Sequence, residues 1–243
     1  MFIKRKNLED KKLNLDNLSK KFHHEIKYLS QYLSFTQQLS EQKNRELEEK
    51  MYLDTESHPE NESIIQQLFE NEIKSLLSYY NHSAIVLIYS VLESILSDIC
   101  SEVKSITSSK FSLNDLSSRN LINKSKSYLE ITSNLDPSLI NDEWAEIGKF
   151  QKLRNMIVHQ NSSFTGDNES MGKQKKIIQC NFPTIEIAEE KRKFYILNNE
   201  LATKFIALIN NVISKIISHI ESITYQIEPN KTKISSSNNY VPF

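Results

Sequence analysis

Glycine and proline break helices and build tight turns, and this chain has very few of either. It contains 3 glycines and 5 prolines in 243 residues. A β-sandwich or β-barrel needs many tight turns, most of which use these residues. Their scarcity therefore predicts an all-α protein, arranged as an up-and-down helical bundle.

The first 60 residues are predicted to form an N-terminal helical extension. Between residues 16 and 35 the spacing of apolar residues is that of one helical face, formed by Leu18, Phe22, Ile26, Leu29 and Leu33. Residues 36–55 are mostly polar and fit either a protruding helix or a loosely packed linker. Pro59 marks a break, since proline suits the first turn of a new helix.

Residues 61–225 are predicted to form the main helical domain. A helix over 62–80 and a break at 81–84 lead to residues 84–103, which are apolar on most of the helix circumference and should be the most buried. Two more helices are expected to follow. One starts at residue 114 or 115, and one uses Asp136 as its N-cap and runs into residues 154–161.

The pattern changes after residue 161. Residues 175–196 hold short β-prone runs interrupted by Pro183, which predicts a small loop or hairpin insertion before the last helix. That helix is expected over about 198–222, where apolar residues form a continuous stripe. Residues 226–243 have little to bury and are predicted to be a disordered tail.

Charge and cysteine usage limit the environment of the chain. A formal net charge of −1 excludes the broad positive field of a protein that coats nucleic acid non-specifically. Cys100 and Cys180 form no CxxC pair, and no apolar segment follows the charged N-terminus, so a reducing cytoplasm is expected. The longest purely apolar run, 84–89, falls far short of the roughly 18 residues that span a bilayer, so no membrane association is expected.

Most common catalytic and cofactor motifs are missing from the sequence. Glycines at 148, 166 and 172 are too scattered to form a phosphate-binding loop. His23 and His24 are adjacent and splay apart on a helix, and the other histidines stand alone in sequence. We therefore predict no metal and no cofactor, and we expect the histidines other than His159 to be solvated or incidental.

The segment RNMIVHQN, residues 154–161, is the stretch whose side chains suggest chemistry. The guanidinium of Arg154 can bind a phosphate through paired N–H donors, and the imidazole of His159 can exchange a proton near neutral pH. Together they suit RNA, whose 2′-hydroxyl can attack its own phosphodiester without a metal. On a regular helix five residues turn through about 140° and rise about 7.5 Å, so the two side chains share a face only if the helix end unwinds.

The same residues also allow a purely structural interpretation. Arg154 could cap or form an ion pair with a neighbouring helix, and His159 could interact with the carbonyls at the C-terminus of its own helix.

Residues 81–103, NHSAIVLIYSVLESILSDICSEV, and residues 150–164, FQKLRNMIVHQNSSF, together resemble the HEPN superfamily. The shared features are a buried helix that carries Glu93 and a second helix that closes with Arg-Asn-x-x-x-His. The resemblance covers residues 62–222 and implies a HEPN-like bundle. In that family the R-x4-6-H motif lines a cleft at a dimer interface and marks metal-independent endoribonucleases of toxin, anti-phage and RNA-processing systems.

The resemblance implies a role for each motif residue. His159 would transfer protons to or from the 2′-hydroxyl and the leaving group, Arg154 would stabilise the pentacovalent phosphorane, and Asn155 would orient the phosphate or the motif. Two facing copies would supply one histidine as base and one as acid, which implies a homodimer with a composite site. Glu93 matches an acidic family position that either orients the arginine or acts in catalysis. Asn161 replaces the tyrosine of the branch paired with a nucleotidyltransferase antitoxin, so modification there is not expected.

The expected function is therefore RNA cleavage to 2′,3′-cyclic phosphate and 5′-hydroxyl ends, as the effector of a bacterial anti-phage or toxin–antitoxin system with an antitoxin or defence protein as partner. One alternative is a non-catalytic HEPN-like module that assembles with a defence or regulatory protein, and another is a structural helical adaptor. Two basic runs could hold the RNA backbone or be ordinary solvated surface. Their residues are Lys173, Lys175, Lys176, Lys191, Arg192 and Lys193.

Overall fold

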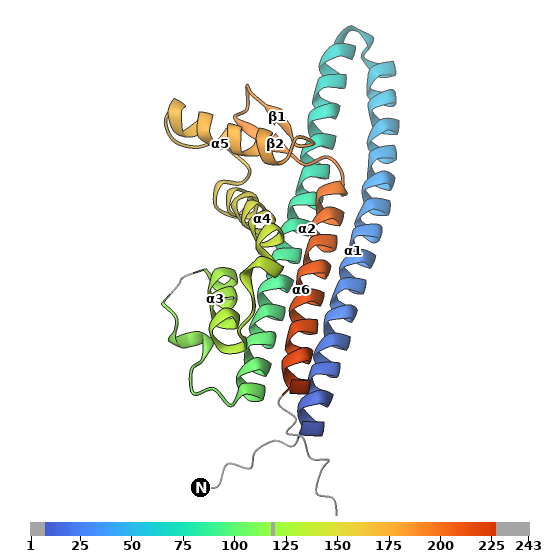
Figure 1. Cartoon of the computed structure of the whole chain (residues 1–243). Helices are drawn as coiled ribbons and strands as arrows, with labels where there is room; N and C mark the ends of the chain where they lie inside the picture. Colours follow the sequence, from blue (N-terminus) through green and yellow to red (C-terminus); the bar gives the residue numbers. More distant parts are fainter. Residues whose placement is uncertain (1–7, 118–119, 227–243) are drawn as a thin grey trace, which may run out of the picture.

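Three long helices lie side by side and form the body of the molecule (Figure 1). The structure is a computed structural model and describes residues 8–117 and 120–226. The long helices are α1 (Leu8–Ser57), α2 (Glu62–Thr107) and α6 (Glu200–Gln226), and each contacts the other two. The predicted all-α architecture is confirmed, because a single two-stranded hairpin is the only sheet within these residues.

Helix α1 is continuous over 50 residues, so the polar segment 36–55 is helix and not a linker. Side chains one turn apart bond to each other along it, for example Gln37 to Glu41 at 3.0 Å and Asn44 to Glu48 at 2.8 Å. Each such pair stabilises a helix by a few tenths of a kcal/mol. Earlier in α1 the apolar face joins the same core as α2 and α6, through Leu15, Phe22, Leu29 and Leu33. The predicted N-terminal extension therefore shares one core with the main helical domain.

Helix α2 runs unbroken from Glu62 to Thr107, so the predicted break at residues 81–84 is wrong. The stretch has no glycine or proline, and its polar residues are satisfied inside the fold. Asn81 is buried and donates to the carbonyl of Leu77 at 2.8 Å and to that of Ile196 at 3.0 Å. The buried helix predicted over 84–103 is confirmed, and Ile85, Leu92 and Ile99 have no exposed surface.

Two shorter helices pack on α2 (Figure 1). Helix α3 (Leu121–Ser133) begins later than predicted, after a short 3₁₀ turn over residues 113–115. Helix α4 (Asn141–Gln160) follows a second 3₁₀ turn, whose amide at Ser138 donates to Asp136 at 2.9 Å. Asp136 therefore caps this turn and not α4 itself.

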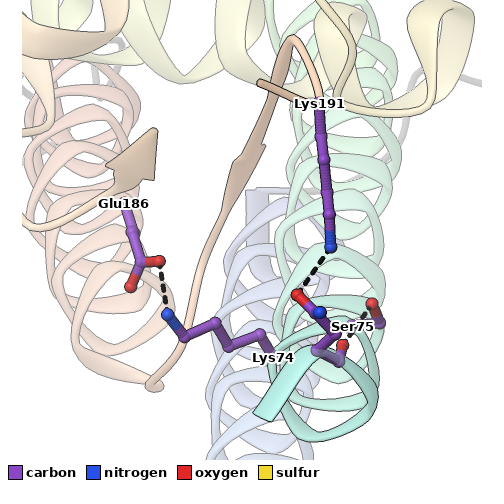
Figure 2. A network of polar contacts seen from close by, with 5 residues as sticks. Lys74, Ser75, Glu186 and Lys191 are labelled. Atoms are coloured by element: carbon purple, nitrogen blue, oxygen red, sulfur yellow. Dashed lines mark hydrogen bonds and ion pairs between the residues drawn. The ribbon is translucent and has the colours of Figure 1, made fainter. Parts of the chain in front are cut away.

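The segment between α4 and α6 contains the predicted hairpin and one helix that was not predicted. Helix α5 (Asn168–Asn181) is mostly polar and buries only Met171 and Ile178, which explains its weak sequence signal. Strands β1 (Glu186–Ala188) and β2 (Lys193–Tyr195) pair antiparallel. Figure 2 shows how the hairpin is tied to α2: Lys74 pairs with Glu186 at 2.8 Å, and Lys191 donates to Asn71 at 2.6 Å.

An aromatic cluster joins α4 to α6 and so places the end of α4. The rings of Phe150 and Phe205 are parallel, with centroids 4.1 Å apart, and Phe182 meets Phe150 edge-on at 5.3 Å. Phe150 and Phe205 are almost completely buried. Because parallel rings in close contact tolerate little displacement, they hold α4 at a defined height along the bundle.

Two helices contain stretches that are long and apolar enough to cross a membrane, judged by length and composition alone. They lie in Pro59–Thr107 and Glu200–Thr224, within the central helices of the bundle, and half of each stretch is buried inside the protein. Core helices of soluble proteins meet the same criterion, so the expectation of no membrane association stays a prediction. The predicted disordered tail lies outside the described residues, except for Gln226.

Removing the Phe150 ring should destabilise the bundle strongly. We expect Phe150→Ala to lower the free energy of unfolding by about 3–5 kcal/mol, the range for deleting a buried aromatic side chain. Phe35→Ala is the matched control, because Phe35 is 63% exposed and its loss should change stability by less than about 0.5 kcal/mol. Urea unfolding followed by circular dichroism measures both, and equal losses would contradict the packing described.

Candidate functional site

Arg154, Asn155 and His159 lie in the last two turns of α4. The helix stays regular to Gln160 because its inner face packs into the core. It ends at Asn161, whose backbone is left-handed with φ of 48°. Asparagine adopts this conformation more easily than most residues, which gives a structural reason for asparagine two residues after the histidine.

Arg154 packs against Tyr89 of α2. Its guanidinium carbon lies 5.3 Å from the centre of the Tyr89 ring, a cation–π contact. Its Nη1 donates to Asn155 Oδ1 at 3.1 Å, while its buried Nε finds no acceptor among the described residues. The ring and the amide thus hold a half-buried guanidinium, and Nη2 has no partner in the described part of the chain. An anionic oxygen could satisfy these donors.

Tyr89 and Glu93 complete the surroundings of Arg154 on α2. Burial raises the pKa of Tyr89 to about 12, helped by the negative charge of Glu93 and opposed by Arg154 and by a hydrogen bond with Gln151. The hydroxyl is therefore neutral at physiological pH. Among the described residues no ion pair joins Glu93 to Arg154, so the arginine rests on the Tyr89 ring without a carboxylate partner. Glu93 places a negative charge near Tyr89 but forms no ion pair with the guanidinium of Arg154 among the described residues.

His159 is exposed and makes no hydrogen bond with any residue that the structure describes. Because α4 does not unwind before Gln160, regular geometry leaves Arg154 and His159 about 140° apart around the helix and about 7.5 Å apart along it. One chain therefore does not bring the two side chains onto one face. Of the contacts that the structural alternative names, an ion pair of Arg154 and a hydrogen bond from His159 to a helix carbonyl are both absent from the described part of the chain, while Arg154 does pack on the neighbouring helix α2.

The six basic residues after the motif fall into two groups. Lys173 pairs with Glu169 at 2.6 Å, Lys175 pairs with Glu189, and Lys191 donates to Asn71 (Figure 2). The two ion pairs are exposed, so they weaken the positive charge of Lys173 and Lys175 without removing it, and the neutral amide of Asn71 leaves the charge of Lys191 unpaired. The second group has no partner for its side chains in the described chain, and consists of Lys176, Arg192 and Lys193.

His82 is a buried residue whose environment the sequence analysis missed. It was expected to be solvated or incidental, but it lies inside the protein between two serine hydroxyls. Ser78 Oγ lies 3.0 Å from His82 Nε2, and Ser162 Oγ lies 3.1 Å from Nδ1 and 3.2 Å from Nε2 of the same ring. A sequence signal existed, because position 82 continues the buried stripe of Ile85 and Tyr89 backwards along α2.

The His82 cluster holds the end of α4. Ser162, the second residue after the helix, has a left-handed backbone with φ of 59°, and its carbonyl accepts from Phe194 of β2 at 3.0 Å. Ser78 in turn accepts from the amide of Ile196 at 3.1 Å. Hydrogen bonds of Ser78, His82 and Ser162 therefore connect α2, the turn after α4 and the hairpin.

This serine–histidine pair is not arranged for nucleophilic catalysis. The hollow beside it measures only about 40 Å³. The amides of residues 162, 163 and 164, which could stabilise an oxyanion, already donate to Met156, Gln160 and Arg192. Burial, with a smaller effect of Lys193, lowers the pKa of His82 to about 4, which makes it a weak base. Its role is structural.

Comparison of the chain with protein-family models, with curated proteins and with solved structures finds no match. Within residues 8–117 and 120–226, no cluster of three histidine, cysteine or acidic side chains is placed to hold a metal ion.

Acid should destabilise the fold through His82. In the folded protein the pKa of His82 is about 4, below its ordinary value of 6.5. Above pH 7 the side chain is therefore neutral in both the folded and the unfolded chain. As the pH falls from 6.5 towards 4, only the unfolded chain takes up the proton, so the folded protein loses stability. By pH 5 the loss should reach up to about 2 kcal/mol. Urea unfolding at pH 7 and pH 5 measures it.

His82→Gln should remove this part of the acid sensitivity. His24→Gln, a change at an exposed histidine, should keep it. If wild type and His82→Gln lost the same stability between the two pH values, His82 would not be the group responsible.

Proposed function

We propose that this protein is a metal-independent endoribonuclease with a HEPN-like bundle, acting in the cytoplasm as the effector of an anti-phage or toxin–antitoxin system. One observation carries the proposal. A guanidinium held on an aromatic ring, with unused N–H donors, lies on the same short helix end as an exposed histidine without a partner in the described chain. An arginine that can bind the phosphate and a histidine that can transfer protons are side chains suited to RNA cleavage through the 2′-hydroxyl.

The proposed reaction uses the RNA's own nucleophile. The 2′-oxygen attacks the adjacent phosphorus while the histidine of one copy accepts the hydroxyl proton, and the bond from phosphorus to the 5′-oxygen breaks as that oxygen takes a proton from the protonated histidine of the facing copy. The products are a 2′,3′-cyclic phosphate and a 5′-hydroxyl. Arg154 would stabilise the charge that builds on the non-bridging oxygens, and Asn155, already bonded to Arg154, would keep it aligned.

The helical geometry favours a site made by two copies. Since Arg154 faces α2 and His159 faces solvent on a regular helix, the arginine of one copy and the histidine of another are easier to bring to one phosphate than the pair within one chain. A two-fold arrangement would place both motifs at one interface. Lys176, Arg192 and Lys193, whose charges are unpaired in the described structure, are the basic residues best suited to bind the RNA backbone.

The second candidate function is a non-catalytic module that assembles with a defence or regulatory protein. It is favoured by the separation of Arg154 and His159 within one chain and by the ion pairs that two of the six basic residues form. In this case the motif would contribute to an interface and not to chemistry.

Cleavage of RNA without metal tests the proposal. Wild-type protein incubated in EDTA with total RNA and tRNA should produce ends that carry a 2′,3′-cyclic phosphate. His159→Ala and Arg154→Ala should each reduce the rate about 10²-fold or more, the usual contribution of a proton-transfer group or of an oxyanion donor. His24→Ala and Arg45→Ala remove exposed residues of the same types and should leave the rate unchanged. Cleavage at the wild-type rate by both His159→Ala and Arg154→Ala would contradict the proposal.

Mixing the two inactive variants tests whether the site is shared. If one arginine and one histidine from different copies suffice, a refolded mixture of Arg154→Ala and His159→Ala chains should recover up to about a quarter of wild-type activity, because half the dimers are mixed and each holds one intact site. The singly mutated homodimers provide the baseline. No recovery, with mixed dimers verified by mass, would mean that the pair acts within one chain or that both histidines are needed.

A further inference from the structure

A second candidate site lies outside the motif, where α1, α2 and the start of α6 meet. It is a cleft of about 450 Å³, within the range of roughly 300–1,000 Å³ for small-molecule sites. Above it α1 and α2 continue as a two-helix arm beyond the start of α6 (Figure 1). The apolar part of the cleft is formed by Ile73, Leu77 and Leu197.

The polar lining of the cleft is organised by hydrogen bonds. Gln37 bridges α1 to the start of α6 by accepting from Asn199 Nδ2 at 2.8 Å. The same Gln37 donates to Glu41 at 3.0 Å, which fixes the carboxylate at the wall. Asn81 is 91% buried and uses both hydrogens of its amide inside the protein, so its oxygen remains to accept from a ligand. The carboxylate of Glu41 and the amide oxygen of Asn81 are therefore hydrogen-bond acceptors at the cleft, available to a ligand that donates.

The charge around the cleft is negative. Glu41 is its one charged lining residue, and no lysine or arginine is among the described residues that line it. The adjoining arm, residues 41–72, carries ten carboxylates against three basic side chains. One of these three, Lys43, lies near Tyr80 of the cleft and is paired with Glu46 at 3.0 Å. An arm of one sign next to a partly enclosed cleft raises the local concentration of ions of the opposite sign.

The start of α6 does not reverse this preference. A helix N-terminus attracts anions by about 0.3–1 kcal/mol. Here the first amide of the helix is already used, because Glu200 N donates to Asn198 Oδ1 at 3.1 Å. Glu200 also places a carboxylate in the first turn.

We propose that this cleft binds a small organic cation, an alkylamine whose ammonium donates to Glu41 and to the Asn81 oxygen while its carbon chain covers the apolar floor. The ammonium offers donors only, which matches a wall of carboxylate and amide oxygens. The aromatic side chain of Tyr80 adds a surface for which cations have affinity. This site is independent of the proposed nuclease, since it shares no residue with the α4 motif.

Titration calorimetry on the full chain tests the proposal with putrescine as the probe. We expect one binding site per chain and no binding of the uncharged diol of the same length or of adenosine monophosphate. Binding should weaken as salt rises, because the arm's field is screened. Absence of putrescine binding at millimolar concentration, or equal binding of the diol or the nucleotide, would overturn the proposal.

Two variants that each remove one negative charge distinguish binding at the cleft from general attraction to the acidic arm. Glu41→Gln should weaken putrescine binding about tenfold or more, the loss expected for one charge-assisted hydrogen bond. Glu49→Gln removes the same charge from an exposed position outside the cleft and should change affinity less than about twofold. Both residues are exposed, so both variants should keep the wild-type thermal midpoint. Equal effects of the two changes, or no effect of Glu41→Gln, would refute a site at the cleft.

Discussion

Burial of α2 is the constraint on which the rest of the structure depends. Residues 84–103 of the helix are apolar around most of the circumference, and α1, α6, α3 and α4 all pack against α2. Ile85, Leu92 and Ile99 are fully buried, and each stabilises the fold by about 1.5–3 kcal/mol. A helix contacted by four others is also a rigid reference for other groups. Tyr89 supports Arg154, His82 secures the end of α4, and Lys74 anchors the hairpin.

Charge is distributed unevenly along the chain. The net charge of −1 conceals a strongly acidic arm over residues 41–72 and a remainder that is net positive. A near-neutral total therefore does not argue against binding of a polyanion at α4, because the field near a site depends on neighbouring charges within roughly 10 Å. The same division makes the arm unsuited to RNA and suited to cations. The proposed nuclease site and the proposed amine cleft thus depend on different parts of one charge distribution.

The sequence-based predictions agree with the structure where they depend on neighbouring residues, and they fail where the structure depends on contacts between distant segments. Periodicity along 84–103 and 198–222 predicted buried helices, and the hairpin before α6 was expected, since these signals are local. The break at 81–84 was wrong because Asn81 and His82 look like loop residues until their partners, Ile196 and Ser162, are known. Helix α5 was missed because it buries little.

By itself, the sequence determined that the protein is helical, which helix lies at the centre, and that Arg154, Asn155 and His159 close one helix. Tertiary structure alone decided that α4 stays regular to Gln160, so that the arginine rests on Tyr89 while the histidine faces solvent. It also decided that His82 is buried and that a cleft forms where three helices meet. The reason is that helix formation depends on neighbours three or four residues away, whereas these features depend on contacts between segments 65 or more residues apart, which no local pattern encodes.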